Sequence, residues 1–197
     1  MRSFVPMVDD PRPHDSRRCD LLDGYTQGDA LWVFGYGSLM WSPGFPVAER
    51  AAALLRGWHR RFCVVSHVYR GTPEKPGLVL GLDRGGACRG LAMRVEPKHA
   101  REALDYLWDR EMITRVYRPM WREVELAQRK VRAATFVADR AHEHYVPERD
   151  PAWAARTIAD AIGQNGSNRD YLKATLAELD QLGIHDRHLR AVLAALP

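Results

Sequence analysis

Residues 31 to about 95 of this chain have the apolar patterns typical of β-strands, and the last third has those typical of helices. Bulky apolar runs broken by glycines and prolines predict strands at residues 32–35, 58–66, 78–82, 89–95, 120–126 and 131–137. The glycines within residues 84–86 predict a turn, and residues 46–55 fit a strand or a helix. Strands first and helices last predict an α+β fold, not a regularly alternating α/β one.

Capping residues and first-turn prolines indicate where the helices begin. Pro97 suits the first turn of an amphipathic helix that runs to about Glu111. Asp150 and Pro151 form a cap and a first-turn proline, which begin a helix that reaches about residue 162. The remaining helix candidates are residues 170–182 and a short helix capped by Asp186.

Residues 1–30 are rich in charge and proline and have no apolar periodicity. We therefore predict a flexible N-terminal arm, a start of regular structure at Leu31, and a single domain over residues 31–197. No segment approaches the roughly 20 apolar residues of a membrane-spanning helix, and no apolar stretch typical of a secretory signal is present. Three cysteines without a CxxC pair argue against a disulfide framework. We expect a cytoplasmic protein that does not bind membranes.

The net charge is +4 and the isoelectric point is about 9.1. Basic residues alternate with acidic ones along the chain, and no basic–aromatic run is present. This pattern argues against nucleic acid and indicates solvated surface charge, with a basic pocket that would suit a small anionic substrate.

Residues 32–41 are the most informative segment for function, because a strand candidate there ends in a Gly-Tyr-Gly-Ser turn. Such a turn can direct backbone N–H groups at one anion, and the alternative is a plain bend. A dinucleotide-binding fingerprint is excluded, because Met40 stands where the third glycine belongs and Pro43 disfavours an immediate helix. We therefore predict a site for a small carboxylate or phosphate.

Glu111 is the candidate base. It lies at the end of the predicted helix, with Trp108, Met112 and Tyr117 nearby in the sequence. Burial among them would raise its pKa and make it a better base near neutral pH. The alternative is a solvated glutamate at a helix end.

The other reactive side chains have plainer interpretations. Cys63 lies in an apolar strand and fits a core residue. Ser38 is not part of a G-x-S-x-G motif, so a hydrolase triad has little support. The close pair His142 and His144 has no further acid or thiol at metal-site spacing, so we expect no metal ion.

The motifs of this chain resemble, in order, those of the ChaC-type γ-glutamylcyclotransferase family, in its glutathione-specific branch. They are residues 33–41 (VFGYGSLMW), 57–63 (GWHRRFC), 70–77 (RGTPEKPG), 107–112 (LWDREM) and 163–172 (GQNGSNRDYL). The resemblance implies a small mixed or barrel-like β-sheet with packed helices. It says nothing about the role of the arm or of the C-terminal end.

The resemblance also implies a reaction. In the family, the α-amine of a γ-glutamyl group attacks its own side-chain amide carbonyl, forms 5-oxoproline and releases the amine part, which is Cys-Gly for glutathione. The reacting atoms share one molecule, so the enzyme fixes rotamers, and one carboxylate can carry the protons. The resemblance implies no cofactor, and the oligomeric state is not predicted.

The catalytic glutamate of the family falls on Glu111. The turn of the family holds the glutamyl end of the substrate, which implies binding by Tyr36, Gly37, Ser38 and Leu39. Arg70 and Tyr171 match motif positions of pocket residues, and Tyr117 is added because it lies near Glu111 in the sequence.

Alternatives stay open. The same fold can act on other γ-glutamyl amino acids or amines, although the loop at Arg70 resembles the glutathione branch most closely. A non-catalytic regulatory protein can use the turn to hold an anionic ligand. Such a protein has no need of a buried acid at Glu111 in addition to the turn. Binding of nucleic acid is the most distant alternative.

Overall fold

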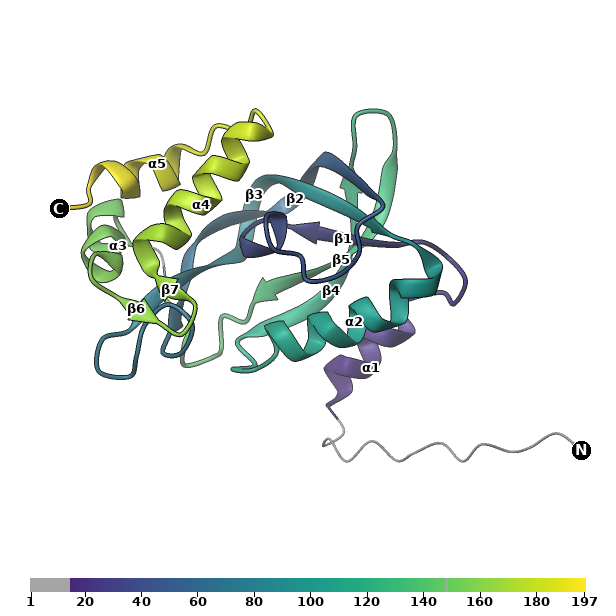
Figure 1. Ribbon diagram of the computed structural model, residues 1–197, viewed down its shortest axis with the longest axis horizontal. Helices are drawn as coiled ribbons and strands as arrows, with labels where there is room; N and C mark the ends of the chain where they lie inside the picture. The colour runs from purple at the N-terminus through teal and green to yellow at the C-terminus, as the bar shows by residue number, and fades with distance from the viewer. Residues whose placement is uncertain (1–14, 148) are drawn as a thin grey trace, which may run out of the picture.

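Among residues 15–147 and 149–197, which the computed structural model describes, five strands close into a β-barrel (Figure 1). They are β1 (Leu31–Gly35), β2 (Glu49–Ser66), β3 (Gly77–Val95), β4 (Tyr117–Glu125) and β5 (Lys130–Ala138). Their order around the barrel is β1-β3-β2-β4-β5, and neighbours are antiparallel except β1 and β5, which run parallel. The predicted α+β fold with a barrel-like sheet is confirmed.

β2 and β3 form one long hairpin. Its register shifts where Gly57, with φ 80°, opposes Gly85 and Gly86, with φ 104° and 66°. The predicted turn at 84–86 is therefore wrong, because these glycines form a bulge inside a continuous strand. Tight hairpin turns and glycine bulges can both use the left-handed backbone that glycine adopts readily, so the sequence does not separate them. The ambiguous segment 46–55 becomes strand from Glu49 onward.

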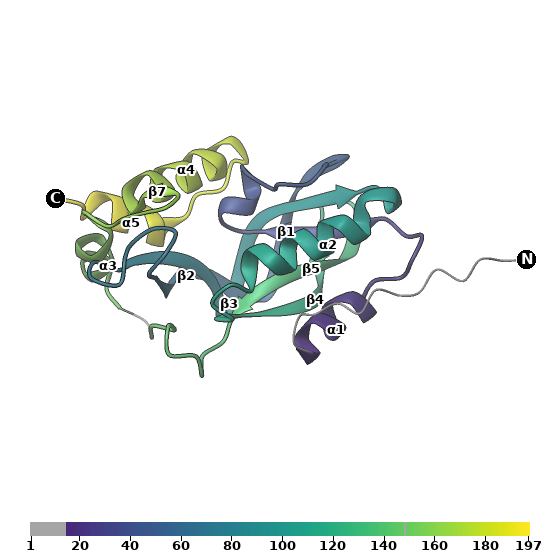
Figure 2. The ribbon, with the colours of Figure 1, turned by 60° about the horizontal axis from the view of Figure 1, so that its bottom comes forward.

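Helix α2 (Pro97–Glu111) packs along one side of the barrel (Figure 2). It begins at Pro97 as predicted, and Ala100, Leu104 and Leu107 bury one face. Because the buried face fixes the helix against the barrel, it also fixes the position of Glu111, the last helical residue.

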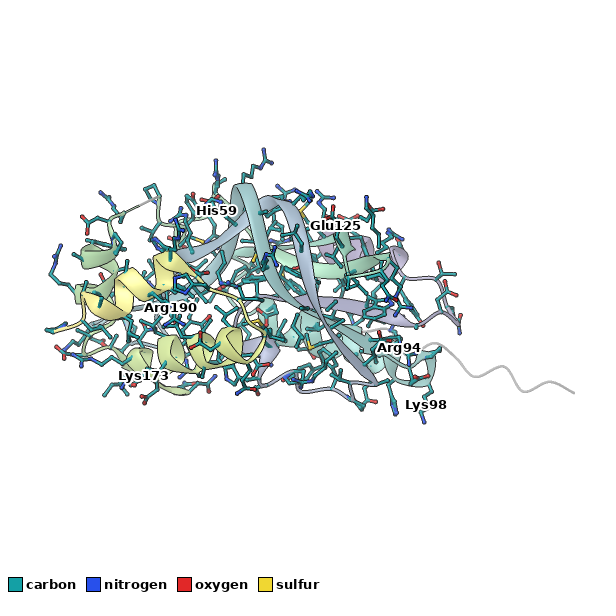
Figure 3. The ribbon with its side chains drawn as sticks, turned by 90° about the horizontal axis from the view of Figure 1, so that it is seen from above. His59, Arg94, Lys98, Glu125, Lys173 and Arg190 are labelled. Carbon is teal, nitrogen blue, oxygen red and sulfur yellow. The ribbon has the colours of Figure 1, made fainter. Side chains whose placement is uncertain are left out.

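The C-terminal helices gather at the opposite end of the molecule from the start of α2, as the labels Lys173, Arg190 and Lys98 show (Figure 3). They are α3 (Pro151–Ile158), α4 (Asn168–Gln181) and α5 (Arg187–Ala194), with a short hairpin of β6 (Ile162–Gly163) and β7 (Gly166–Ser167) before α4. The side chains of Asp150, Ser167 and Asp186 each accept a backbone N–H at the start of a helix, which confirms the two predicted aspartate caps. In the part of the chain that the structure describes, no helix is long and apolar enough to cross a membrane.

Regular structure does not start at Leu31. Helix α1 (Ser16–Asp23) precedes β1 and packs beside α2 and against β4, where Trp121 donates a hydrogen bond of 3.1 Å to the carbonyl of Leu21. The predicted start of regular structure at Leu31 is thus wrong, because the segment predicted as a flexible arm contains α1, while residues 1–14 lie outside the described part. The helix has one buried side chain, Leu21, which is too few to produce an apolar periodicity. The assignment of residues 31–197 to a single domain stays a prediction.

Candidate functional site

A cavity of about 760 Å³ opens where the interior of the barrel meets the glycine turn, the end of α2 and the first turns of α4. All residues predicted for the site line it: Tyr36, Gly37, Ser38, Leu39, Arg70, Glu111, Tyr117 and Tyr171. The fold therefore gathers into one cavity segments that are far apart in the sequence.

The glycine turn is held by a buried strand on one side and a one-turn 3-10 helix (Ser38–Met40) on the other. Gly37 has φ −137° and is not left-handed. Its lack of a side chain serves close packing, because a Cβ there would lie 3.1 Å from the Tyr171 hydroxyl. Among the described residues, no hydrogen bond uses the backbone N–H of Gly37 or Ser38. Both residues line the cavity, so their N–H groups are candidate donors to an anion.

Glu111 is partly buried at the end of α2, with 17% of its side chain exposed. Within residues 15–147 and 149–197, its carboxylate has one ion-pair partner, the Nε of Arg110 at 3.2 Å. Burial raises the pKa of Glu111, and the neighbouring charge of Arg110 opposes this shift without cancelling it. Glu111 thus has the environment of a proton carrier.

Arg110 links Glu111 to the glycine turn. Its guanidinium donates to the Ser38 hydroxyl at 2.9 Å and to the carbonyl of Ser42 at 2.5 Å. The sequence analysis missed this residue, because an arginine in the last turn of a helix is already explained by the helix dipole. Its position directly before Glu111 in the 107–112 motif is the signal that could have found it.

Three buried tyrosines face the same cavity. Tyr36 donates to the carbonyl of Phe136 at 2.8 Å, and Tyr117 donates to the carbonyl of Leu80 at 2.7 Å. Tyr171 instead accepts the N–H of Leu80 at 3.2 Å, so its own O–H proton is left to donate. Burial raises the pKa of Tyr171 to about 12, so the hydroxyl stays protonated at neutral pH.

Arg70 lies in the cavity wall over the ring of Tyr171, with 5.1 Å from its guanidinium carbon to the ring centroid. It donates to the carbonyls of Asn165 at 2.5 Å and Ser167 at 3.3 Å, which ties the loop after β2 to the β6–β7 hairpin. Its guanidinium thus already holds backbone carbonyls, and direct binding of substrate by Arg70 stays a prediction.

No three His, Cys, Asp or Glu side chains are arranged to hold a metal ion in the described ranges 15–147 and 149–197. The chemical groups that line the cavity include backbone N–H groups, tyrosine hydroxyls, guanidinium groups and one carboxyl with a raised pKa, that of Glu111. This set suits the binding of an anion and the movement of a proton.

Comparisons with known proteins agree with the geometry. The family model for ChaC-like proteins matches residues 31–196. The chain is 39% identical over 167 residues to the glutathione-specific γ-glutamylcyclotransferase of Escherichia coli strain K12, which covers 84% of this chain and 72% of that protein. It is 33% identical over 195 residues to the human glutathione-specific γ-glutamylcyclotransferase 1, which covers 93% and 85% of the two chains. The crystal structure of the yeast γ-glutamyl cyclotransferase specific to glutathione superposes with a TM-score of 0.75 at 25% identity, and covers 85% of this chain and 98% of that one.

Proposed function

The chain belongs to the ChaC-like protein family, and from that membership we propose that it is a glutathione-specific γ-glutamylcyclotransferase acting in the cytoplasm. The reaction converts glutathione into 5-oxoproline and Cys-Gly. The observation that carries the proposal is the placement of a partly buried carboxyl with a raised pKa, Glu111, in the same cavity as the glycine turn.

The turn holds the glutamyl end of the substrate. The N–H groups of Gly37 and Ser38 can donate to its α-carboxylate, and the Tyr171 hydroxyl adds a third donor beside Gly37. Several donors fixed in a partly buried wall bind a carboxylate well, because no reorganisation is needed when it arrives.

Glu111 carries the protons. Its carboxylate takes a proton from the substrate ammonium, and the freed lone pair forms a bond to the γ-carbonyl carbon. The bond from that carbon to the cysteine nitrogen then breaks, and this nitrogen takes a proton from Glu111. Overall the attacking nitrogen loses two protons and the leaving nitrogen gains two, so one carboxyl can transfer them in turn.

The raised pKa of Glu111 suits this double task. A carboxyl with an ordinary pKa is too weak a base to accept a proton from an ammonium group efficiently. Burial brings the proton affinity of Glu111 closer to that of the amine, while Arg110 holds the carboxylate in place. Because both reacting groups belong to one substrate molecule, fixing its rotamers supplies much of the remaining rate.

The test is incubation of the purified protein with glutathione, followed by detection of 5-oxoproline and Cys-Gly by mass spectrometry. We expect both products in equal amounts. We expect γ-glutamyl-alanine to react at least about tenfold more slowly, because a glutathione-specific pocket would lose its contacts with the parts of glutathione that this compound lacks. Equal rates on both compounds would assign the enzyme to γ-glutamyl substrates in general, and no 5-oxoproline from either would contradict the proposed function.

A further inference from the structure

β2 carries two neighbouring buried arginines, Arg60 and Arg61, whose side chains are 3% and 5% exposed. Successive residues of a strand point to opposite faces of the sheet. Each guanidinium therefore meets different partners, and each is paired with its own aspartate, Asp186 or Asp83.

Arg60 faces the glycine turn. Its Nη1 donates to the carbonyl of Tyr36 at 3.1 Å and to the carbonyl of Arg89 at 3.0 Å. The Tyr36 carbonyl belongs to the peptide bond whose N–H is that of Gly37, one of the two turn donors without a partner among the described residues. The position of the Arg60 guanidinium thus sets the orientation of this peptide.

Asp186 holds the other side of the same guanidinium. One carboxylate oxygen accepts from Nε at 3.1 Å and from Nη2 at 2.8 Å, and the second accepts the N–H of Leu189 at 3.0 Å as the cap of α5. The aspartate is itself 13% exposed and fixed by the helix that it caps. A continuous chain of contacts therefore runs from α5 through Asp186 and Arg60 to the turn.

We infer that Asp186 and Arg60 are positioning residues, through which the C-terminal helix α5 sets the geometry of the turn that binds the substrate carboxylate. This inference rests on the proposed function of the turn. A buried guanidinium that loses its carboxylate seeks other acceptors, because an unpaired buried charge is strongly unfavourable. The Tyr36 carbonyl then loses a fixed donor, and the N–H of Gly37 no longer points where the carboxylate binds.

Asp186→Asn is the test, and Asp83→Asn is its matched control. Asparagine caps helices about as well as aspartate, so α5 keeps its start while the charge facing Arg60 is lost. Asp83 is the more deeply buried partner of the adjacent Arg61, with 5% of its side chain exposed. Among the described residues it bonds to Arg61, Arg84, Arg140 and Tyr145 and not to the turn.

We expect Asp186→Asn to raise the KM for glutathione about tenfold and to leave kcat within about twofold. The turn binds the carboxylate in the ground state and in the transition state alike, so weaker binding there changes KM and not kcat. Asp83→Asn lowers the melting temperature and leaves KM within about twofold of the wild type. The positioning role would be overturned if KM were the same in Asp186→Asn and the wild type, or if it rose equally in both variants. Turnover of glutathione by the wild type would still support the proposed function in either case.

Hydrogen exchange gives a readout that does not depend on turnover. A peptide covering residues 33–41 exchanges faster in Asp186→Asn than in the wild type, and at the wild-type rate in Asp83→Asn. If Asp186→Asn does not fold, Asp186→Glu, which keeps the charge and displaces it by one methylene group, is expected to shift KM in the same direction. Unchanged exchange at residues 33–41 together with an unchanged KM in the folded variant would contradict the inference.

Discussion

Two carboxyl groups of this protein, the partly buried Glu111 and the buried Asp83, have pKa values that move in opposite directions. Asp83 is the more deeply buried, with 5% of its side chain exposed against 17% for Glu111. Its pKa is nevertheless lowered well below the ordinary value, whereas the pKa of Glu111 is raised. Burial alone therefore does not decide the charge of a carboxyl here.

The difference lies in the hydrogen-bond donors around each group. Asp83 accepts from the guanidinium groups of Arg61 and Arg140, the hydroxyl of Tyr145 and the N–H of Arg84, at 2.6 to 2.9 Å. Among the described residues, Glu111 has the single ion-pair partner Arg110. A carboxylate surrounded by donors is stabilised as an anion and serves the structure, whereas one with few donors keeps its affinity for a proton and can serve chemistry.

The largest effect is expected for Glu111→Gln. We expect the turnover of glutathione to fall on the order of 10³-fold, because an amide cannot carry the proton. Steady-state assays measure this loss. The control is Glu102→Gln on the exposed side of α2, which keeps wild-type turnover. Near-normal turnover by Glu111→Gln would remove this residue from the mechanism.

Asp83→Asn is expected to affect stability instead. Loss of one charge from a buried ionic cluster lowers the free energy of unfolding by about 3 kcal/mol, while kcat and KM of the folded enzyme are retained. Urea unfolding measures the change. Because folding lowers the pKa of Asp83, its stabilisation is present above the unfolded-state value near pH 3.9 and is lost as the pH falls below it. The variant therefore loses less stability on acidification than the wild type, and an identical acid dependence would contradict this account of Asp83.

Arg110→Met removes the cation that pairs with Glu111. We expect kcat/KM at pH 7 to fall about tenfold, since both the carboxylate and the turn lose a hydrogen-bonded partner. The pKa of Glu111 rises further without the neighbouring charge, so the acid limb of the pH profile of kcat/KM moves to higher pH. The matched control is Arg101→Met on the same helix, whose side chain is 66% exposed. An acid limb at the same pH in both proteins would show that Arg110 does not influence the pKa of Glu111.

The smallest effect is a gain in stability for Glu111→Gln. A carboxyl whose pKa is raised by folding stabilises the fold below its unfolded-state value, and this contribution is lost as the pH rises through the folded-state pKa. Above the folded-state pKa the ionised Glu111 therefore destabilises the fold, and its replacement by glutamine adds about 1 kcal/mol to the free energy of unfolding. A loss of stability at pH 7 would indicate that Glu111 is held by partners as Asp83 is.

The sequence predicted those features that depend on neighbouring residues. The helix caps at Asp150 and Asp186, the start of α2 at Pro97 and the glycine turn follow from local rules of backbone geometry. The resemblance assigned Glu111, and its raised pKa follows from burial at the end of an amphipathic helix.

The remaining features depend on contacts between distant parts of the chain. The parallel pairing of β1 with β5 and the docking of α1 on β4 have no local signature, and a glycine pair such as Gly85 and Gly86 suits a bulge as well as a turn. The partners that Arg110 and Arg60 have in the glycine turn lie on other elements, so only the fold reveals that both arginines reach it.

The most direct test of the central claim is the pKa of Glu111 in the folded enzyme. A pH titration followed by carbon NMR of the labelled carboxyl groups measures it, with Glu111→Gln to assign the signal. We predict a pKa above the ordinary glutamate value, with the signal of Asp83 still that of an anion in the same pH range. A pKa of Glu111 at or below the ordinary value would contradict its role as the proton carrier.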